Sequence, residues 1–154
     1  MPIDVLIVRD SRESTKKCSL TPLRGMSGIR FVNYDPDRRV DAGARILLHK
    51  DGDELSARDA GRGLLLIDCA WRRVDSVLAT VDGDLVRRRL PKLVTAYPRT
   101  SKLFEDPATG LASVEALYAA LALLGEPRQE LLDGYRWKDA FLSRNASHFR
   151  AGAS

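Results

Sequence analysis

The segment Leu64-Leu65-Leu66-Ile67-Asp68-Cys69-Ala70-Trp71-Arg72-Arg73 says most about how this 154-residue chain folds. Its four consecutive aliphatic residues predict a buried strand that ends on the carboxylate of Asp68, and the apolar spacing that follows predicts a helix over residues 70–80. Ligands of an open α/β sheet bind at the carboxyl ends of its strands, so Asp68 and Trp71 are candidates for a catalytic or cofactor-binding corner. The same pattern also fits a helix cap at Asp68 and a core position at Trp71.

The composition indicates a packed domain with a moderately basic surface. Hydrophobic residues make up 44% of the chain, and the formal net charge is +4. A chain of this length forms one domain or two small lobes that share an interface. Cys18 and Cys69 lack metal-binding spacing, no apolar run approaches about 18 residues, and the N-terminus has no signal-peptide pattern. We therefore expect a soluble cytoplasmic protein with no membrane span and no metal site.

Segments with the aliphatic pattern of strands all precede residue 97. They are residues 3–8, 28–34, 44–49, 64–67 and 90–96. Residues 56–63 are expected to form a helical crossover, and Asp82-Gly83 a turn that ends the helix over 70–80. Such crossovers imply a mostly parallel sheet, although several connections are too short for full helices.

Helical spacing replaces the strand pattern after residue 112. Ser113 has the character of an N-cap for a helix that ends near Gly125, and Glu115 places a negative charge in its first turn. Further helices are expected over residues 127–132 and 137–142. The predicted fold class is therefore α/β, with a mostly parallel sheet lobe over residues 1–96 and an all-helical lobe over residues 97–154.

Three ordered segments carry a family resemblance. The first is Lys16-Lys17-Cys18-Ser19, and the second is Asp68-Cys69-Ala70-Trp71 after its buried strand. The third combines Arg88-Arg89-Leu90-Pro91-Lys92-Leu93-Val94-Thr95-Ala96 with Ser113-Val114-Glu115-Ala116-Leu117. In order and spacing these segments, which span about residues 3–145, resemble the small-subunit (16S/18S) rRNA aminocarboxypropyltransferase family of ribosome biogenesis.

One loop departs from the family pattern. The family usually carries Asn-x-x-Asn-Tyr-Gly there, whereas this chain has a longer loop from Tyr97 to Pro107. That loop is similar to the loop of the related DTW-domain enzymes, which modify tRNA uridines, although their cysteine metal motifs are absent here. The departure bears on the RNA target more than on the chemistry, and small-subunit rRNA is favoured over tRNA.

The resemblance implies a SPOUT-like fold with a trefoil knot and with S-adenosyl-L-methionine between the two lobes. It also implies transfer of a 3-amino-3-carboxypropyl group to a uridine-type base of RNA. The cofactor has three electrophilic carbons beside its sulfur, so the enzyme has to turn the methyl group away from the nucleophile. An indole face also stabilises a neighbouring cation by about 0.5–2 kcal/mol.

The resemblance assigns a role to several residues of the predicted site. Asp68 is the candidate catalytic residue, which accepts the ring proton or aligns the base. Trp71 and Val74 would enclose the methyl group, Ser19 and Thr109 would bind the methionine carboxylate, and the Ile67 carbonyl would accept from the ribose. An apolar pocket for adenine is matched by Leu48, Leu90 and Ala112. Without the resemblance, most of these positions are ordinary core or loop residues.

Basic clusters provide candidate phosphate contacts with RNA. The predicted RNA-binding residues are Lys16, Lys17, Arg72, Arg73, Arg87, Arg88 and Arg89. Charge clusters are more often solvated surfaces, and Trp137 is expected to pack among the helices rather than to stack on a base. No exposed stripe marks a dimer interface, so a monomer is expected.

Three other functions stay open at this point. One is a small-molecule transferase, which would turn over the cofactor without RNA. A methyltransferase would use the same cofactor with its methyl group exposed, which the bulk of Trp71 and Val74 opposes. A catalytically silent RNA-binding assembly factor is kept open by the altered loop over residues 97–107.

Overall fold

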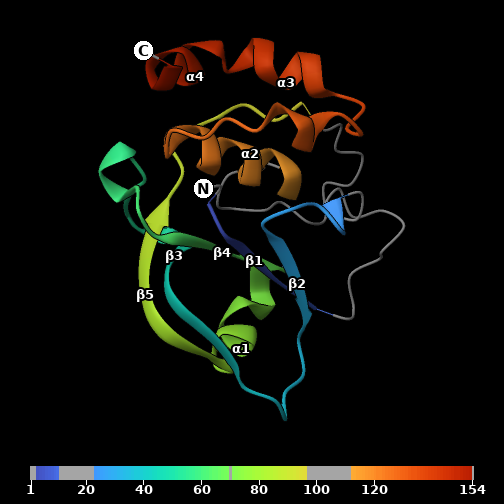
Figure 1. Ribbon diagram of the computed structural model, residues 1–154, viewed down its shortest axis with the longest axis vertical. Helices are drawn as coiled ribbons and strands as arrows, with labels where there is room; N and C mark the ends of the chain where they lie inside the picture. The colour runs from blue at the N-terminus through green and yellow to red at the C-terminus, as the bar shows by residue number, and fades with distance from the viewer. Residues whose placement is uncertain (1–2, 11–22, 70, 97–111, 154) are drawn as a thin grey trace.

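A sheet of parallel strands forms the centre of the computed structural model, which describes residues 3–10, 23–69, 71–96 and 112–153 (Figure 1). Within these residues the sheet has five strands in the order β2-β1-β4-β3-β5, and every neighbouring pair is parallel. The strands are β1 (Val5–Arg9), β2 (Ile29–Asn33), β3 (Val40–Glu54), β4 (Gly63–Asp68) and β5 (Val81–Arg89). The prediction of a mostly parallel α/β sheet is confirmed.

Helices lie on both sides of the sheet. The α-helices are α1 (Val74–Leu78), α2 (Ser113–Leu123), α3 (Lys138–Arg144) and α4 (Ala146–Ala153), and the 3₁₀ helices are η2 (Ala57–Asp59), η3 (Trp71–Arg73) and η4 (Gln129–Leu132). Figure 1 shows α1 on one side of the sheet and α2 on the other, with α3 and α4 beyond α2. None of the helices in the described part of the chain is both long and apolar enough to span a bilayer.

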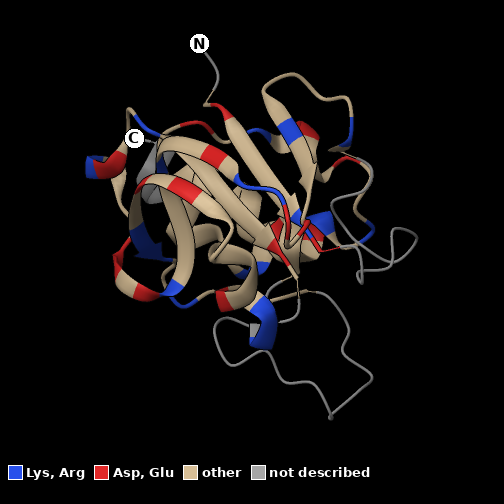
Figure 2. Cartoon of the chain, turned by 90° about the horizontal axis from the view of Figure 1, so that it is seen from below, with Lys and Arg blue, Asp and Glu red and all other residues tan. Residues whose placement is uncertain are grey.

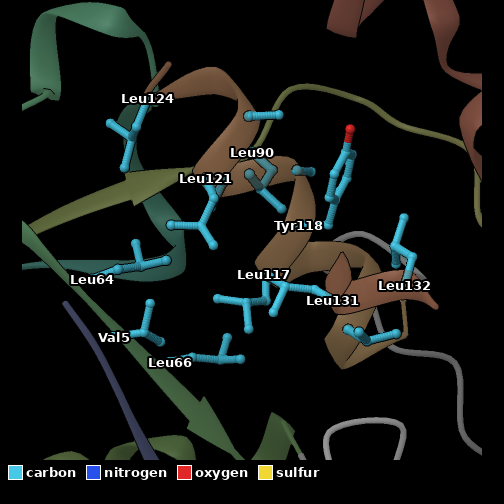
Figure 3. Close-up of a cluster of buried hydrophobic side chains, with 14 of the residues drawn as sticks. Val5, Leu64, Leu66, Leu90, Leu117, Tyr118, Leu121, Leu124, Leu131 and Leu132 are labelled. Carbon is cyan, nitrogen blue, oxygen red and sulfur yellow. The ribbon is translucent and has the colours of Figure 1, made fainter. Parts of the chain in front are cut away.

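Alternation along the central strands divides the core into two clusters. Successive side chains of a strand point to opposite faces. Val5, Ile7, Leu64 and Leu66 therefore pack in the cluster that α2 covers, whereas the residues between them pack in the cluster that contains Val77 of α1. In Figure 3, Val5, Leu64 and Leu66 of the sheet face the leucines of α2. Both faces of β1 and β4 are buried, as expected for strands at the centre of a parallel sheet.

The outermost helices are joined to α2 by aromatic packing. Tyr118 of α2 meets Phe141 of α3 and Phe149 of α4 edge-on, with ring centroids 6.5 and 5.3 Å apart. Phe141 is fully buried. The helices after residue 112 therefore share one apolar cluster with the sheet.

The predicted fifth strand is wrong. Residues 90–96 form no strand, and β5 instead covers residues 81–89, including the expected turn at Asp82-Gly83. Gly83 has a φ of 146°, and a Cβ there would lie 2.4 Å from the carbonyl oxygen of Gly43, so glycine permits a close approach of β5 to β3. The register between these two strands shifts at this point, between Asp41 and Ala44. A glycine at a strand irregularity was thus misread as a turn.

Helix boundaries differ from the predictions in smaller ways. The helix expected over 70–80 is present as η3 followed by α1, but the crossover expected over 56–63 contains only the three-residue η2. The N-cap of α2 is Ala112 rather than Ser113. Glu115 supplies the capping interaction instead, because its carboxylate accepts the backbone N–H of Ala112 at 2.8 Å.

Candidate active site

Polar side chains end the two central strands on the face that α2 covers. The alternation that buries Val5 and Ile7 places Arg9 on this face, and the alternation of Leu64 and Leu66 places Asp68 there. Arg9 and Asp68 are also register partners across β1 and β4. Two apolar columns therefore end side by side in an arginine and an aspartate at the carboxyl edge of the sheet.

Arg9 and Asp68 form a buried ion pair. Nε of Arg9 lies 3.0 Å from Oδ2 of Asp68, and the two side chains are only 3% and 6% exposed. The Arg9 guanidinium also lies 4.9 Å from the centroid of the Phe31 ring on β2. Ser113, the first residue of α2, brings its Oγ to 3.5 Å from Oδ1 of Asp68, which is close to the limit for a hydrogen bond. The Asp68 carboxylate is thus held where the sheet meets α2.

A second ion pair lies on the opposite face at the same edge. Nε of Arg73 lies 2.5 Å from Oδ2 of the buried Asp10, and the Arg73 guanidinium lies 5.9 Å from the ring of Tyr34. The backbone N–H of Asp10 donates to the carbonyl of Asp68 at 3.0 Å. Asp10 therefore connects the end of β4 with η3, the turn that contains Trp71.

The segment over residues 94–96 runs between helices and is held by their side chains. Glu115 of α2 accepts hydrogen bonds from Thr95 Oγ1 at 2.6 Å and from the Ala96 N–H at 2.9 Å. From the other side, the buried amide of Asn145 accepts the N–H of Val94 at 2.7 Å and donates to its carbonyl at 2.8 Å. These side chains provide the partners that a neighbouring strand would otherwise supply.

The structure brings some of the predicted cofactor-binding residues together. Leu48 and Leu90 pack in the same cluster as Leu66, on the face of Asp68, and Ala112 directly precedes α2. Ile67 packs in the opposite cluster, and Val74 is a half-buried residue at the start of α1. Trp71 is described only by its backbone in η3, while Ser19 and Thr109 lie outside the described residues.

The predicted RNA-binding arginines lie in two separate places. Arg72 is exposed and Arg73 half-buried directly after β4. Arg87, Arg88 and Arg89 instead lie on the edge strand β5, which β3 separates from β4. Arg88 lies 3.0 Å from Asp59 and Arg89 lies 3.4 Å from Glu54. Figure 2 shows acidic and basic residues interleaved over the described strands and loops. Lys16 and Lys17 lie outside the described residues.

His49 of β3 has a pKa below its usual value. Burial lowers its pKa from the usual 6.5, and the nearby charge of Arg87 lowers it further. Nδ1 lies 3.7 Å from the Asp51 carboxylate, but it accepts the backbone N–H of Asp51 at 3.1 Å, which requires its lone pair. Among the described residues, no group of three His, Cys, Asp or Glu side chains is arranged to hold a metal ion.

Three polar residues at this edge were not predicted. Arg9 and Asp10 end the run Val5–Val8 in the same way as Asp68 ends the run Leu64–Ile67, and this repeated pattern was the available signal. Glu115 was expected only to complement the helix dipole. Glu115 is completely buried, and its carboxylate also accepts the backbone N–H of Ala96 from another segment.

The residues at the edge of the sheet fit a ligand that is partly apolar and partly polar. Leu66 and Leu90 are each 8% exposed and belong to the apolar cluster on the face of Asp68, whose carboxylate lies 3.5 Å from the hydroxyl of Ser113. An adenine ring suits apolar neighbours of this kind, and polar groups of a ligand suit a hydroxyl and a carboxylate. The donor set is thus compatible with S-adenosylmethionine.

Comparisons with known proteins agree with this interpretation. Residues 42–153 match the family model described as "Ribosome biogenesis protein, C-terminal". A 16S rRNA aminocarboxypropyltransferase of Methanopyrus kandleri is 31% identical over 153 residues, which cover 95% of this chain and 87% of the relative. The enzyme of that name from Vulcanisaeta distributa is 36% identical over 96 residues, which cover 60% of this chain and 50% of the relative. The solved structure of the SAM-dependent rRNA:acp-transferase Tsr3 from Vulcanisaeta distributa matches with a TM-score of 0.75 and 29% identity, covering 99% of this chain and 84% of that one.

Proposed function

Because this chain belongs to the ribosome biogenesis protein family whose C-terminal model it matches over residues 42–153, we propose that it transfers a 3-amino-3-carboxypropyl group to a uridine-type base of small-subunit rRNA. The donor is S-adenosyl-L-methionine. The observation that carries this proposal is the buried carboxylate of Asp68, which Arg9 holds at the carboxyl edge of β4 beside the start of α2. The names of the relatives from Methanopyrus and Vulcanisaeta support the same reaction.

The cofactor is assigned to the junction between the sheet edge and α2. When bound, S-adenosylmethionine supplies a sulfonium that activates the adjacent carbon of the methionine chain. The adenine pocket would be lined by Leu48, Leu90 and Ala112. The carbonyl of Ile67 would accept hydrogen bonds from the ribose hydroxyls. Further contacts are assigned to Ser19, Trp71, Val74 and Thr109.

We assign to Asp68 the role of proton acceptor. As a ring nitrogen of the base forms its bond to the carbon and the carbon–sulfur bond breaks, Asp68 accepts the N–H proton and later releases it to solvent. The bound donor would supply the leaving group, a neutral thioether that keeps the electron pair of the broken bond. Arg9 holds Asp68 in place for this step. Holding all reacting groups in the reactive geometry lowers a barrier by up to about 7–11 kcal/mol, and the orientation of Asp68 is one part of that effect.

RNA is the macromolecular partner, and its phosphates are assigned to basic residues. Arg72 lies beside the site, while Arg87, Arg88 and Arg89 would contact more distant phosphates from β5. Lys16 and Lys17 complete the assigned set. Arg73 is already in contact with the carboxylate of Asp10, which offsets part of its charge toward a phosphate.

The finer architecture and the setting of the protein are also proposals. We assign residues 1–96 to an α/β lobe and residues 97–154 to an all-helical lobe that completes the cofactor cleft. A SPOUT-like trefoil knot is supported by the ordered family motifs. A monomer that works in the cytoplasm fits the reaction on small-subunit rRNA.

Isotope transfer from S-adenosylmethionine tests the proposed reaction. The cofactor is labelled separately in its methyl and carboxyl carbons and is incubated with the protein and with small-subunit RNA from a strain that lacks the enzyme. We expect carboxyl label in the RNA, and nucleoside mass spectrometry of the labelled fragment then identifies the base. Methyl label in the RNA would show a methyltransferase. Cofactor binding with neither label transferred would favour a silent assembly factor.

A further inference from the structure

Glu115 is a completely buried carboxylate within the most apolar helix of the fold. It lies on α2 and is 0% exposed, with Val114 and Leu117 of the main apolar cluster beside it. An ionised carboxylate is stable in such a place only if donors surround it. Glu115 has three donors at short distances, the Thr95 hydroxyl at 2.6 Å and the N–H groups of Ala112 and Ala96 at 2.8 and 2.9 Å.

These donors come from two places that are distant in the sequence. Thr95 and Ala96 end the extended segment that follows β5, and Ala112 directly precedes α2. The two carboxylate oxygens divide the donors between them, with Oε1 accepting from Thr95 and Ala112 and Oε2 from Ala96. One side chain therefore fixes the chain both before residue 97 and after residue 111.

Helix α3 fixes the same segment from its other side. Asn145 binds both backbone groups of Val94, and Nη1 of Arg144 donates to the carbonyl of Thr95 at 2.9 Å. The segment is thus anchored independently of Glu115. A change at Glu115 would then displace the chain around Ala112 more easily than it would displace Val94 and Thr95.

We propose that Glu115 is a positioning residue of the cofactor site, which sets the placement of Ala112 and Ser113 against Asp68. This inference rests on the proposed function. Ser113 is the residue of α2 whose hydroxyl lies 3.5 Å from the Asp68 carboxylate, and its backbone follows directly on the N–H that Glu115 holds. Because helix α2 starts at this point, a shift at Ala112 changes the distance between the helix and the edge of the sheet.

The variant Glu115→Gln tests the proposal with almost no change in size. A glutamine has one acceptor oxygen and one donor NH2 group, so it cannot accept from both Ala96 and Ala112 through separate oxygens. Thr95→Val is the milder variant, since it removes only the hydroxyl donor. Glu130→Gln is the matched control, because Glu130 is exposed and pairs with Arg128 on the surface.

Two measurements that need no turnover give the result. We expect the dissociation constant of S-adenosylhomocysteine, measured by calorimetry, to rise roughly tenfold or more for Glu115→Gln and a few-fold for Thr95→Val, with no change for Glu130→Gln. We also expect amide exchange to become faster at Ala112 and Ala96, whose N–H groups both donate to Glu115, while Val94, which Asn145 holds, keeps its exchange rate.

The outcomes separate this proposal from a purely structural role. If both variants unfold at lower temperature but bind S-adenosylhomocysteine as tightly as the wild type, Glu115 stabilises the fold without positioning the site, and the proposal is overturned. If Glu115→Gln does not fold, Thr95→Val decides between the two results. If the wild-type protein itself binds no S-adenosylhomocysteine, the proposed function fails and the positioning role fails with it.

Discussion

Replacing Arg9 by methionine removes the cation that lies 3.0 Å from the carboxylate of Asp68, and with it the contact between the guanidinium and the Phe31 ring. The side chains of the pair are 3% and 6% exposed, so water cannot easily replace the guanidinium. Removal of one partner of a buried pair destabilises a protein by about 3–5 kcal/mol. Since total stabilities are about 5–15 kcal/mol, this single change should be clearly visible in urea unfolding.

A double-mutant cycle isolates the interaction energy between Arg9 and Asp68. The cycle contains Arg9→Met, Asp68→Asn and the double variant, each unfolded in urea at neutral pH. We expect the double variant to be more stable than the sum of the single changes predicts, by about 1–3 kcal/mol, because neither side chain is then charged. The control cycle uses Arg39 and Asp82, whose side chains are 63% and 53% exposed. Solvent screens that pair, so its coupling should be much smaller.

Additive effects of Arg9→Met and Asp68→Asn on the free energy of unfolding would show that the two side chains do not interact. If the cycle closes within about 0.5 kcal/mol, Arg9 does not stabilise the ionised form of Asp68. A coupling no larger than that of the exposed control pair would lead to the same conclusion.

Three further changes test other parts of the structure. Burial lowers the pKa of His49 below 6.5, so below about that pH the unfolded chain binds more protons than the folded protein and the free energy of unfolding should fall. The variant His49→Asn should flatten this dependence on pH in urea unfolding. An unchanged slope would contradict the lowered pKa. Gly83→Ala should lower the free energy of unfolding in urea by about 1–3 kcal/mol more than Gly25→Ala does. Both glycines have a positive φ, but of the two only Gly83 lies against a backbone oxygen. Equal effects would show that β5 does not approach β3 closely at Gly83. Phe141→Ala should lower the free energy of unfolding by about 3–5 kcal/mol, because the side chain is fully buried between α2 and α4. A loss below about 1 kcal/mol would contradict that packing.

The central part of the sheet could be predicted because its sequence signals are local. The aliphatic runs over residues 3–8 and 64–67 form β1 and β4, and the carboxylate that ends the second run lies at the carboxyl edge of the sheet. Alternation alone determines which face each side chain of these strands occupies. Asp68 could therefore be placed from the sequence, whereas its partner Arg9 is identified only by the pairing of the two strands.

The segment over residues 90–96 could not be predicted because its partners are distant side chains. Its apolar residues have the pattern of a strand, but its backbone groups bind Glu115 and Asn145 rather than a neighbouring strand. No local rule indicates that a glutamate in a first helical turn has such a role. The same limit applies to β5, where the turn signal of Asp82-Gly83 is overridden by the close approach to β3.

The most direct test of the account compares transfer and cofactor binding in Asp68→Asn. The asparagine keeps the size of the side chain but cannot accept the ring proton as a carboxylate does. We expect the rate of carboxyl-label transfer to small-subunit RNA to fall by about a hundredfold or more, while S-adenosylhomocysteine binds within a few-fold of the wild-type affinity. Transfer at the wild-type rate in Asp68→Asn would contradict the central claim and remove this carboxylate from the mechanism.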